Sequence, residues 1–270
     1  MIKDKRMVLL HALTPLHVGT GQAVGNVDLP IAREKATGFP IVPASAFKGV
    51  LRDLFRTGDN EEDWVIRAFG DEKVAGAWVF TDLRLLCLPV RSFYGVFAYA
   101  TCPLILRQLQ QRAHAFGVAG FENLTLEVAG TTALAPSDTT LAHNGKLYLE
   151  DIDLNLQSSP EAEAITQTIG NALGLPALSR QFVILSDEVF NFFSETATEI
   201  NARVRLDDTK TVADGGLWYE EAVPAEAIFY GFIATTGTEP ALEALGDERL
   251  LQIGGDASIG RGVCRVVMRA

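Results

Sequence analysis

Apolar runs of strand length, separated by segments of helical spacing, restrict this chain to a mixed fold. The runs are MVLLHAL (7–13), AWVFTDLRLLCLPV (77–90), KLYLEDIDLNL (146–156), FVILS (182–186), AIFYGFIATTG (227–237) and GVCRVVMR (262–269). Such β-branched and aromatic runs favour strands. The segments between them that are typical of helices are 43–56, 103–116, 161–173 and 241–253. We therefore predict an α+β fold.

The segment PASAFKGVLRDLFR (43–56) is the best-defined helix of the sequence. Its apolar residues recur at helical spacing, which places Lys48 and Arg52 together on the opposite face, four residues apart. Pro43 suits the first turn of a helix. The pattern predicts an amphipathic helix with a cationic outer face.

Composition excludes several protein classes. Apolar residues make up 48% of the 270 residues and charged residues 21%, which is typical of a folded globular protein. The N-terminus lacks the pattern of a signal peptide, and the apolar charge-free stretch at 92–106 is shorter than the roughly 18 residues of a spanning helix. The three cysteines are far apart and odd in number, which favours free thiols in a reducing compartment: Cys87, Cys102 and Cys264. We expect a cytoplasmic protein without membrane segments.

Charge is unevenly distributed along the chain. The formal net charge is −11, which argues against unspecific attraction to nucleic acid. Residues 1–56 nevertheless contain more Lys and Arg than Asp and Glu. This basic segment indicates either one surface that faces phosphates or an ordinary solvated surface of mixed charge.

The long segment between the first strand and the helix at 43–56 holds most of the residues able to carry chemistry. It contains glycines, His17, Asp28, Arg33 and Lys35, and no HExxH, GxxxxGK[ST] or GxSxG motif occurs in the chain. From the residues alone, Asp28 is a turn acceptor, a partner of Arg33, or a metal ligand beside a phosphate. His17 is either a general acid or base or a hydrogen-bonded core residue.

Two later segments contain candidate anion-binding residues. GGDASIGRG (254–262) loosely resembles a phosphate cradle, in which Gly254, Gly255 and Gly260 expose backbone N–H groups beside Arg261. The alternative is an ordinary loop.

The segment at 202–224 predicts a projecting hairpin, in which Arg203 and Arg205 supply cations and Trp218 a stacking face. The alternative for Leu217 and Trp218 is core packing. Glu220 and Glu221 would help a metal site if the fold brought them near Asp28.

Three separated segments together are similar to a known family. HVGTGQAVGNVDLPIAREKATGFPIVPASAFKGVLRD, RVRLDDTKTVADGGLWYEE and IGGDASIGRG resemble the backbone RAMP subunit of the type III-B CRISPR effector, the Cmr complex. The likeness covers residues 16–53 and 182–263, and the middle of the chain is not distinctive. The resemblance implies one RAMP domain over 1–270: a modified RRM-like, ferredoxin-like (βαββαβ) palm with inserted finger elements and a thumb hairpin at about 200–223.

The resemblance also implies a function and a site. Such subunits stack as copies along a CRISPR guide RNA, with other Cmr subunits, and cleave complementary single-stranded target RNA at regular intervals. The family's catalytic aspartate lies in a VDLP-type loop, which assigns catalysis and metal binding (Mg²⁺ or Mn²⁺) to Asp28, with His17 as a second catalytic candidate. The implied RNA-binding residues are Arg33, Lys35, Ser45, Lys48, Arg52, Arg203, Arg205, Trp218, Gly254, Gly255, Gly260 and Arg261. The expected chemistry is metal-assisted attack of a ribose 2′-OH on the adjacent phosphate.

Three rival interpretations remain open at the level of sequence. The equivalent backbone subunit of the type III-A Csm complex shares the fold and the acid, and the LWYEE segment favours the Cmr assignment. A non-catalytic RNA-binding scaffold would use Asp28 only structurally. A small-molecule enzyme has no motif in its support.

Overall fold

Four antiparallel strands form the centre of the protein. A computed structural model describes residues 3–21, 27–56, 61–237 and 241–270, so residues 22–26, just before the VDLP-type loop, lie outside the described residues. Strands β1 (Lys5–Ala12), β4 (Leu83–Arg91), β12 (Ile228–Thr235) and β14 (Val263–Arg269) lie in the order β14-β1-β12-β4. Counted along the chain this order is 4-1-3-2, which is that of a ferredoxin-like sheet. The α+β prediction is confirmed.

The helix at the start of the palm forms as the sequence predicts. Helix α1 (Ala44–Leu54) follows the short strand β2 (Ile41–Val42) and buries Phe47 and Leu51. Helix α2 (Asp63–Phe69) and strand β3 (Trp78–Phe80) come next, and β3 pairs with the end of β12. The single strand predicted at 77–90 is thus two strands, β3 and β4. Both pair with β12, but at different stretches of it.

The prediction of a helix at 241–253 is wrong. Residues Leu242–Leu245 form a single 3₁₀ turn, and Glu248–Gln252 form strand β13, which pairs with β14 at the edge of the sheet. Gly246, at φ +70°, stops the helical turn. The turn places Leu242 and Leu245 in the core without a longer helix, whereas Leu250 is exposed on the edge strand.

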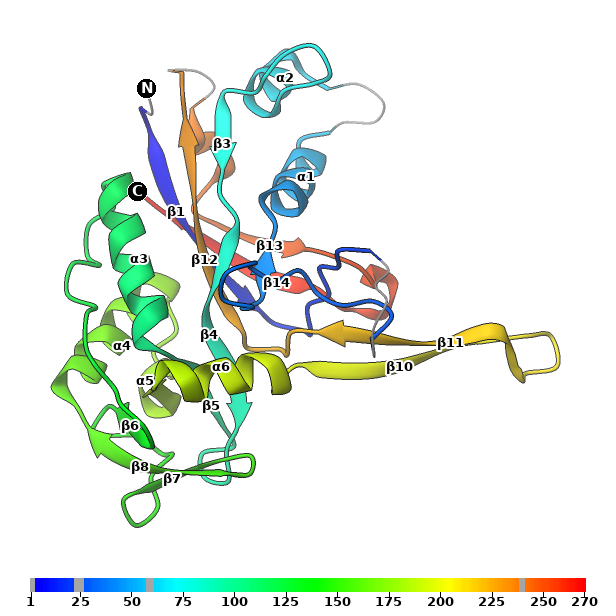
Figure 1. Ribbon diagram of the computed structural model, residues 1–270. Coiled ribbons are helices and arrows are strands. Elements are labelled where there is room, and N and C mark those ends of the chain that lie inside the picture. The colour runs from blue at the N-terminus through cyan, green and yellow to red at the C-terminus, as the bar shows by residue number, and fades with distance from the viewer. Residues whose placement is uncertain (1–2, 22–26, 57–60, 238–240) are drawn as a thin grey trace.

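A long insertion between β4 and β12 extends the sheet. It contains β5 (Phe97–Thr101), α3 (Pro103–Phe116), β6 (Thr132–Ala135), β7 (Lys146–Leu149), β8 (Ile152–Ser158), α4 (Pro160–Leu173), α5 (Leu178–Gln181), β9 (Phe182–Leu185) and α6 (Asp187–Thr196). The sheet continues from β4 in the order β5-β9-β6-β8-β7. Helices α3, α4 and α5 lie on one side of the molecule, where α3 reaches the palm strands and its Phe116 stacks on Phe232 of β12 (Figure 1). The predicted strand at 146–156 is a hairpin, β7–β8, whose turn places Glu150 at φ +47°.

A two-stranded hairpin projects from the body of the protein. Strands β10 (Glu199–Leu206) and β11 (Val212–Ala222) pair with each other in a sheet of their own and extend well beyond the other elements (Figure 1). Register places Ala202 opposite Tyr219 and Val204 opposite Leu217, so one face of the hairpin is apolar and exposed. The projecting hairpin predicted near 200–223 is confirmed.

Two further expectations concern burial and membranes. Cys87, Cys102 and Cys264 are buried free thiols, as predicted, and burial raises the pKa of Cys264 to about 12. Among the helices of the described residues, none combines the length and apolarity that crossing a membrane requires.

Candidate functional site

Asp28 lies at the base of the β10–β11 hairpin, and β11 holds it there. The Tyr219 backbone N–H donates to Oδ2 of Asp28 at 2.7 Å, and the Tyr219 carbonyl accepts from the N–H groups of Asp28 and Leu29. Leu29 also forms a parallel bridge with Glu220. These contacts fix the VDLP loop along β11 while the Asp28 residue stays exposed. The carboxylate is therefore presented to solvent from a fixed backbone.

Arg33 pairs with Glu221 and not with Asp28. Its Nη2 lies 2.5 Å from Oε1 of the buried Glu221, and its Nη1 donates to the carbonyls of Gly38 and Ser194. Glu221 also accepts from Thr198 Oγ1 at 2.9 Å and from the Ile31 N–H at 3.1 Å. The alternative in which Asp28 balances Arg33 is therefore wrong. The predicted contact of Arg33 with RNA stays a prediction.

His17 is enclosed by the same strand and by the glycine-rich loop. Its Nδ1 lies 2.6 Å from the Glu221 carbonyl, which can only accept, so Nδ1 carries the proton and Nε2 of the neutral ring is an acceptor. The His17 carbonyl accepts from the Gly255 N–H at 2.9 Å. Asp28 and His17 are thus both held by β11, through residues 219 and 221 respectively.

The loop at 254–262 needs its glycines for close approach. Gly254 has φ +83°, and a Cβ there would lie 2.1 Å from the His17 carbonyl oxygen. Gly260 has φ +78° with open space around it, and Gly254, Gly255 and Gly260 are all exposed. Arg261 is largely covered and lies near Glu220, at 3.7 Å. The N–H groups of Gly255 and Gly260 donate to the carbonyls of His17 and Ala257, so the prediction that they face an anion is wrong, and an anion contact of the Gly254 N–H stays a prediction.

The cations and the tryptophan of the hairpin lie on one face. Trp218 stands opposite Arg203 in the register, and both are half-buried, while Arg205 is exposed. Leu217 is 52% exposed on the other face, so its alternative role in core packing is wrong. The sequence interpretation missed the exposed apolar face that Ile200, Val204, Leu206, Val212, Leu217 and Tyr219 form, although their alternation in β10 was a readable signal.

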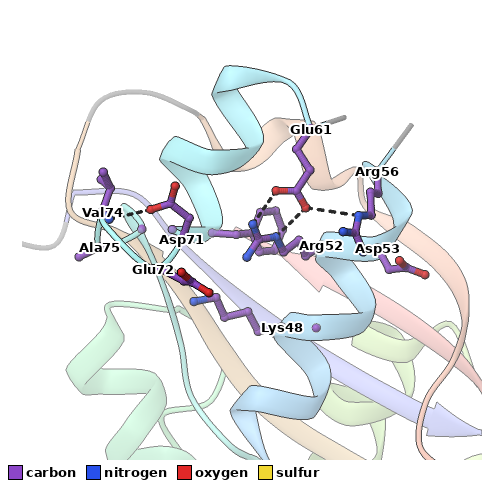
Figure 2. Close-up of a pocket in the computed structure, with 13 residues that line it drawn as sticks. Lys48, Arg52, Asp53, Arg56, Glu61, Asp71, Glu72, Val74 and Ala75 are labelled. Atoms are coloured by element: carbon purple, nitrogen blue, oxygen red, sulfur yellow. Dashed lines mark hydrogen bonds and ion pairs between the residues drawn. The ribbon is translucent and has the colours of Figure 1, made fainter. Parts of the chain in front are cut away.

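The cationic face of α1 lines a pocket of about 720 Å³. Figure 2 shows Arg52 and Arg56 pointing toward Glu61, which lies just before α2. Arg52 forms a bidentate pair with Glu61, at 2.8 and 2.5 Å, and this pair lowers the pKa of Glu61. Lys48 lines the same pocket. An RNA phosphate would therefore compete with Glu61 for Arg52. Ser45, on α1, and Lys35, in a turn before β2, are exposed.

Glu220 and Glu221 do not gather around Asp28 as metal ligands. Glu221 is bonded to Arg33, and Glu220 is buried beside Arg203, Arg261 and Asp256. In the described part of the chain, no three His, Cys, Asp or Glu side chains lie close enough together to hold a metal ion. Asp28 alone supplies an exposed carboxylate at this site, which fits a cation such as Mg²⁺ that takes one or two protein carboxylates and substrate oxygens.

Comparisons with known proteins place this geometry in a family. The model of the RAMP superfamily matches residues 9–265. The CRISPR system Cmr endoribonuclease Cmr4 of Pyrococcus furiosus is 36% identical, over 97% of this chain and 95% of that protein. The CRISPR system Cms endoribonuclease Csm3 of Mycobacterium tuberculosis is 31% identical, over only 28% of this chain and 39% of its own length.

A solved structure gives the same result for the fold. The crystal structure of oligomeric Cmr4 from Pyrococcus furiosus matches with a TM-score of 0.80 and 29% identity, over 98% of this chain and 97% of that one. The match extends through residues 60–180, which are not distinctive in sequence. The insertion and the hairpin are therefore part of the shared fold.

Proposed function

The chain belongs to the RAMP superfamily, and from this premise we propose that it is a backbone subunit of a type III-B CRISPR (Cmr) effector that cleaves target RNA. The observation that carries the proposal is the 36% identity to a Cmr endoribonuclease over nearly the whole length of both proteins. An exposed Asp28 at the base of a projecting hairpin supports it, because a carboxylate in that position is accessible to a long polymer.

The proposed partners are a CRISPR guide RNA, a complementary single-stranded target RNA, further copies of this chain and other Cmr subunits. The oligomeric form of the similar Pyrococcus protein supports stacking of copies. In a stack, each copy presents one Asp28, so cleavage recurs at the repeat distance of the subunits. Lys48, Arg205 and the loop at 254–262 supply the guide contacts, and the complex acts in the cytoplasm.

The proposed reaction uses the ribose of the target as nucleophile. The 2′-oxygen forms a bond to the adjacent phosphorus, the bond from phosphorus to the 5′-oxygen breaks, and a proton moves from the 2′-OH to the leaving oxygen. The products are a 2′,3′-cyclic phosphate and a 5′-hydroxyl. Asp28 orients the reacting segment, and Nε2 of His17 is an acceptor available for a proton.

A divalent cation fits this site as a bridge between protein and RNA. Asp28 would supply one oxygen ligand, and phosphate oxygens and water the others. When bound, Mg²⁺ or Mn²⁺ supplies charge stabilisation at the phosphate. The fixed backbone of residues 28 and 29 along β11 defines where that ligand sits.

Two alternatives make different demands. A Csm backbone subunit is disfavoured because the sequence matches to Csm3 proteins cover only 28% and 32% of this chain. A non-catalytic scaffold would bind guide and target without cutting.

The test is Asp28→Asn in the complex assembled on a guide RNA. Asn keeps an oxygen that accepts from the Tyr219 N–H and removes the charge, so assembly and target affinity should be unchanged while cleavage falls at least about a hundredfold. The matched control is Asp153→Asn, an exposed aspartate on β8. A target with a single 2′-deoxyribose at the cut should resist at that linkage. Cleavage by Asp28→Asn at the normal rate and spacing would reject Asp28 as the catalyst, and an uncut target with the unaltered complex would favour the scaffold.

A further inference from the structure

Four charged side chains join the base of the hairpin to the glycine-rich loop. Arg203 and Glu220 come from β10 and β11, and Asp256 and Arg261 come from the loop. We call these four residues the charge cluster. Arg203 Nη2 lies 2.8 Å from Asp256 Oδ1, whereas the ion pairs that involve Glu220 are longer, at 3.7 and 3.9 Å. A single short ion pair thus connects two segments that are 53 residues apart in sequence.

The charge cluster is partly buried and incompletely bonded, and the side chains of Arg203 and Asp256 are 25% and 21% exposed. The side chain of Glu220 is only 4% exposed and that of Arg261 13%. Among the described residues, Glu220 Oε1, Asp256 Oδ2 and Arg261 Nη1 are covered and have no hydrogen-bond partner. Burial, together with the neighbouring Asp256 carboxyl, raises the pKa of Glu220. Buried charges of this kind contribute little to stability compared with an apolar replacement, so a role in positioning accounts better for them.

The charge cluster adjoins the residues that hold Asp28 and His17. Glu220 follows Tyr219, whose N–H donates to Asp28, and precedes Glu221, whose carbonyl accepts from His17. On the loop side, Asp256 follows Gly255, whose N–H donates to the His17 carbonyl. The Arg203–Asp256 pair therefore fixes the hairpin and the glycine-rich loop, which both hold the candidate site, relative to each other.

We infer that Arg203 and Asp256 are positioning residues for cleavage, which hold β11 and the loop in the one arrangement that aims Asp28 at the target. This inference rests on the proposed function. It differs from a role in RNA affinity. If Asp256 merely neutralised Arg203 and Arg261, its removal would free two cations and tighten RNA binding.

The decisive variant is Asp256→Asn in the assembled complex. Asp256 adopts φ +61°, which Asn tolerates, so the loop keeps its backbone and loses only the charge. With saturating target, the single-turnover rate should fall about tenfold or more, since small displacements of a catalytic group are costly, while target affinity stays within about twofold. The control is Glu248→Gln, which removes an acid paired with Arg265 at 2.7 Å, away from β11.

A second pair of variants tests the inference if Asp256→Asn does not assemble. Arg203→Lys keeps a cation for Asp256 and should retain most of the rate, whereas Arg203→Met should lose about as much as Asp256→Asn. The double variant Arg203→Met with Asp256→Asn should be no slower than the slower single variant, because both remove the same contact.

The outcomes separate this inference from the proposed function. An unaltered complex that leaves target RNA uncut rejects the function itself. An unaltered complex that cuts, with Asp256→Asn at the same rate or with tighter RNA binding, overturns the positioning role alone. Equal rates for Arg203→Lys and Arg203→Met overturn it as well.

Discussion

The two substitutions Gly254→Ala and Gly260→Ala isolate the close approach of the glycine-rich loop to His17. Both glycines have positive φ, +83° and +78°, so alanine carries a similar conformational penalty of about 1–2 kcal/mol at each. Only Gly254 has a backbone atom in the way, since its Cβ would lie 2.1 Å from the His17 carbonyl oxygen. At Gly260, the described residues leave the space open to 4 Å.

The extra cost at Gly254 follows from that contact. The loop must move by more than 1 Å to restore an ordinary van der Waals distance. This movement breaks the hydrogen bond from the Gly255 N–H to the His17 carbonyl, which is worth about 1 kcal/mol. We expect Gly254→Ala to lose about 2–4 kcal/mol of unfolding free energy and Gly260→Ala about 1–2 kcal/mol.

The assay is urea unfolding of both variants with the unaltered protein, followed by cleavage in the assembled complex. Equal m-values would show that the midpoints report stability. Gly254→Ala should also slow cleavage more than Gly260→Ala, because it displaces the backbone of His17. Equal losses for the two variants would refute the claim that close backbone approach is what position 254 requires.

Two further predictions concern buried and half-buried acids. Glu221→Ala should cost about 3–5 kcal/mol in urea unfolding because it leaves Arg33 without its buried partner, whereas Glu248→Gln, at an exposed pair, should have a much smaller effect; similar losses would contradict this. Hydrogen bonding from His11 lowers the pKa of Glu226 below 4.5, so its ionised form stabilises the fold above that pH and this stabilisation is lost as the pH falls. The stability difference between the unaltered protein and Glu226→Gln should therefore shrink in acid, and a constant difference would argue against it.

Local patterns were sufficient to predict much of the fold. Helix α1 and the central strands carry their own periodicity, and the hairpin has turn residues between two β-prone arms. The failure at 241–253 has a physical reason. Its leucines have helical spacing, but the edge of β14 offers hydrogen bonds that Glu248–Gln252 take instead. Tertiary pairing of this kind has no local signal.

The candidate site residues stand out in the sequence, whereas the residues that hold them do not. Asp28 and His17 lie in a recognisable segment, yet Tyr219 and Glu221, which hold them, lie about 200 residues away. The basic balance of residues 1–56 was misleading for a related reason, since Arg33 and Arg52 are paired with acids outside that segment. Charge counted along a chain does not show which cations remain available to RNA.

The register of β11 explains how one strand both holds the candidate site at its base and forms one arm of the projecting hairpin. Successive side chains of a strand point to opposite faces, so Glu220 faces the charge cluster while Glu221 faces Arg33, and a slip of one residue would exchange them. The irregularity in pairing lies between Val204 and Leu206, on the tip side of the Arg203–Trp218 pair. Between the Val204–Leu217 and Leu206–Val212 pairs, β11 contains more residues than β10, and Gly215, at φ +62°, is one of them. Changes in length at the tip therefore leave the register at the base intact, and the position of Asp28 is independent of how far the hairpin extends.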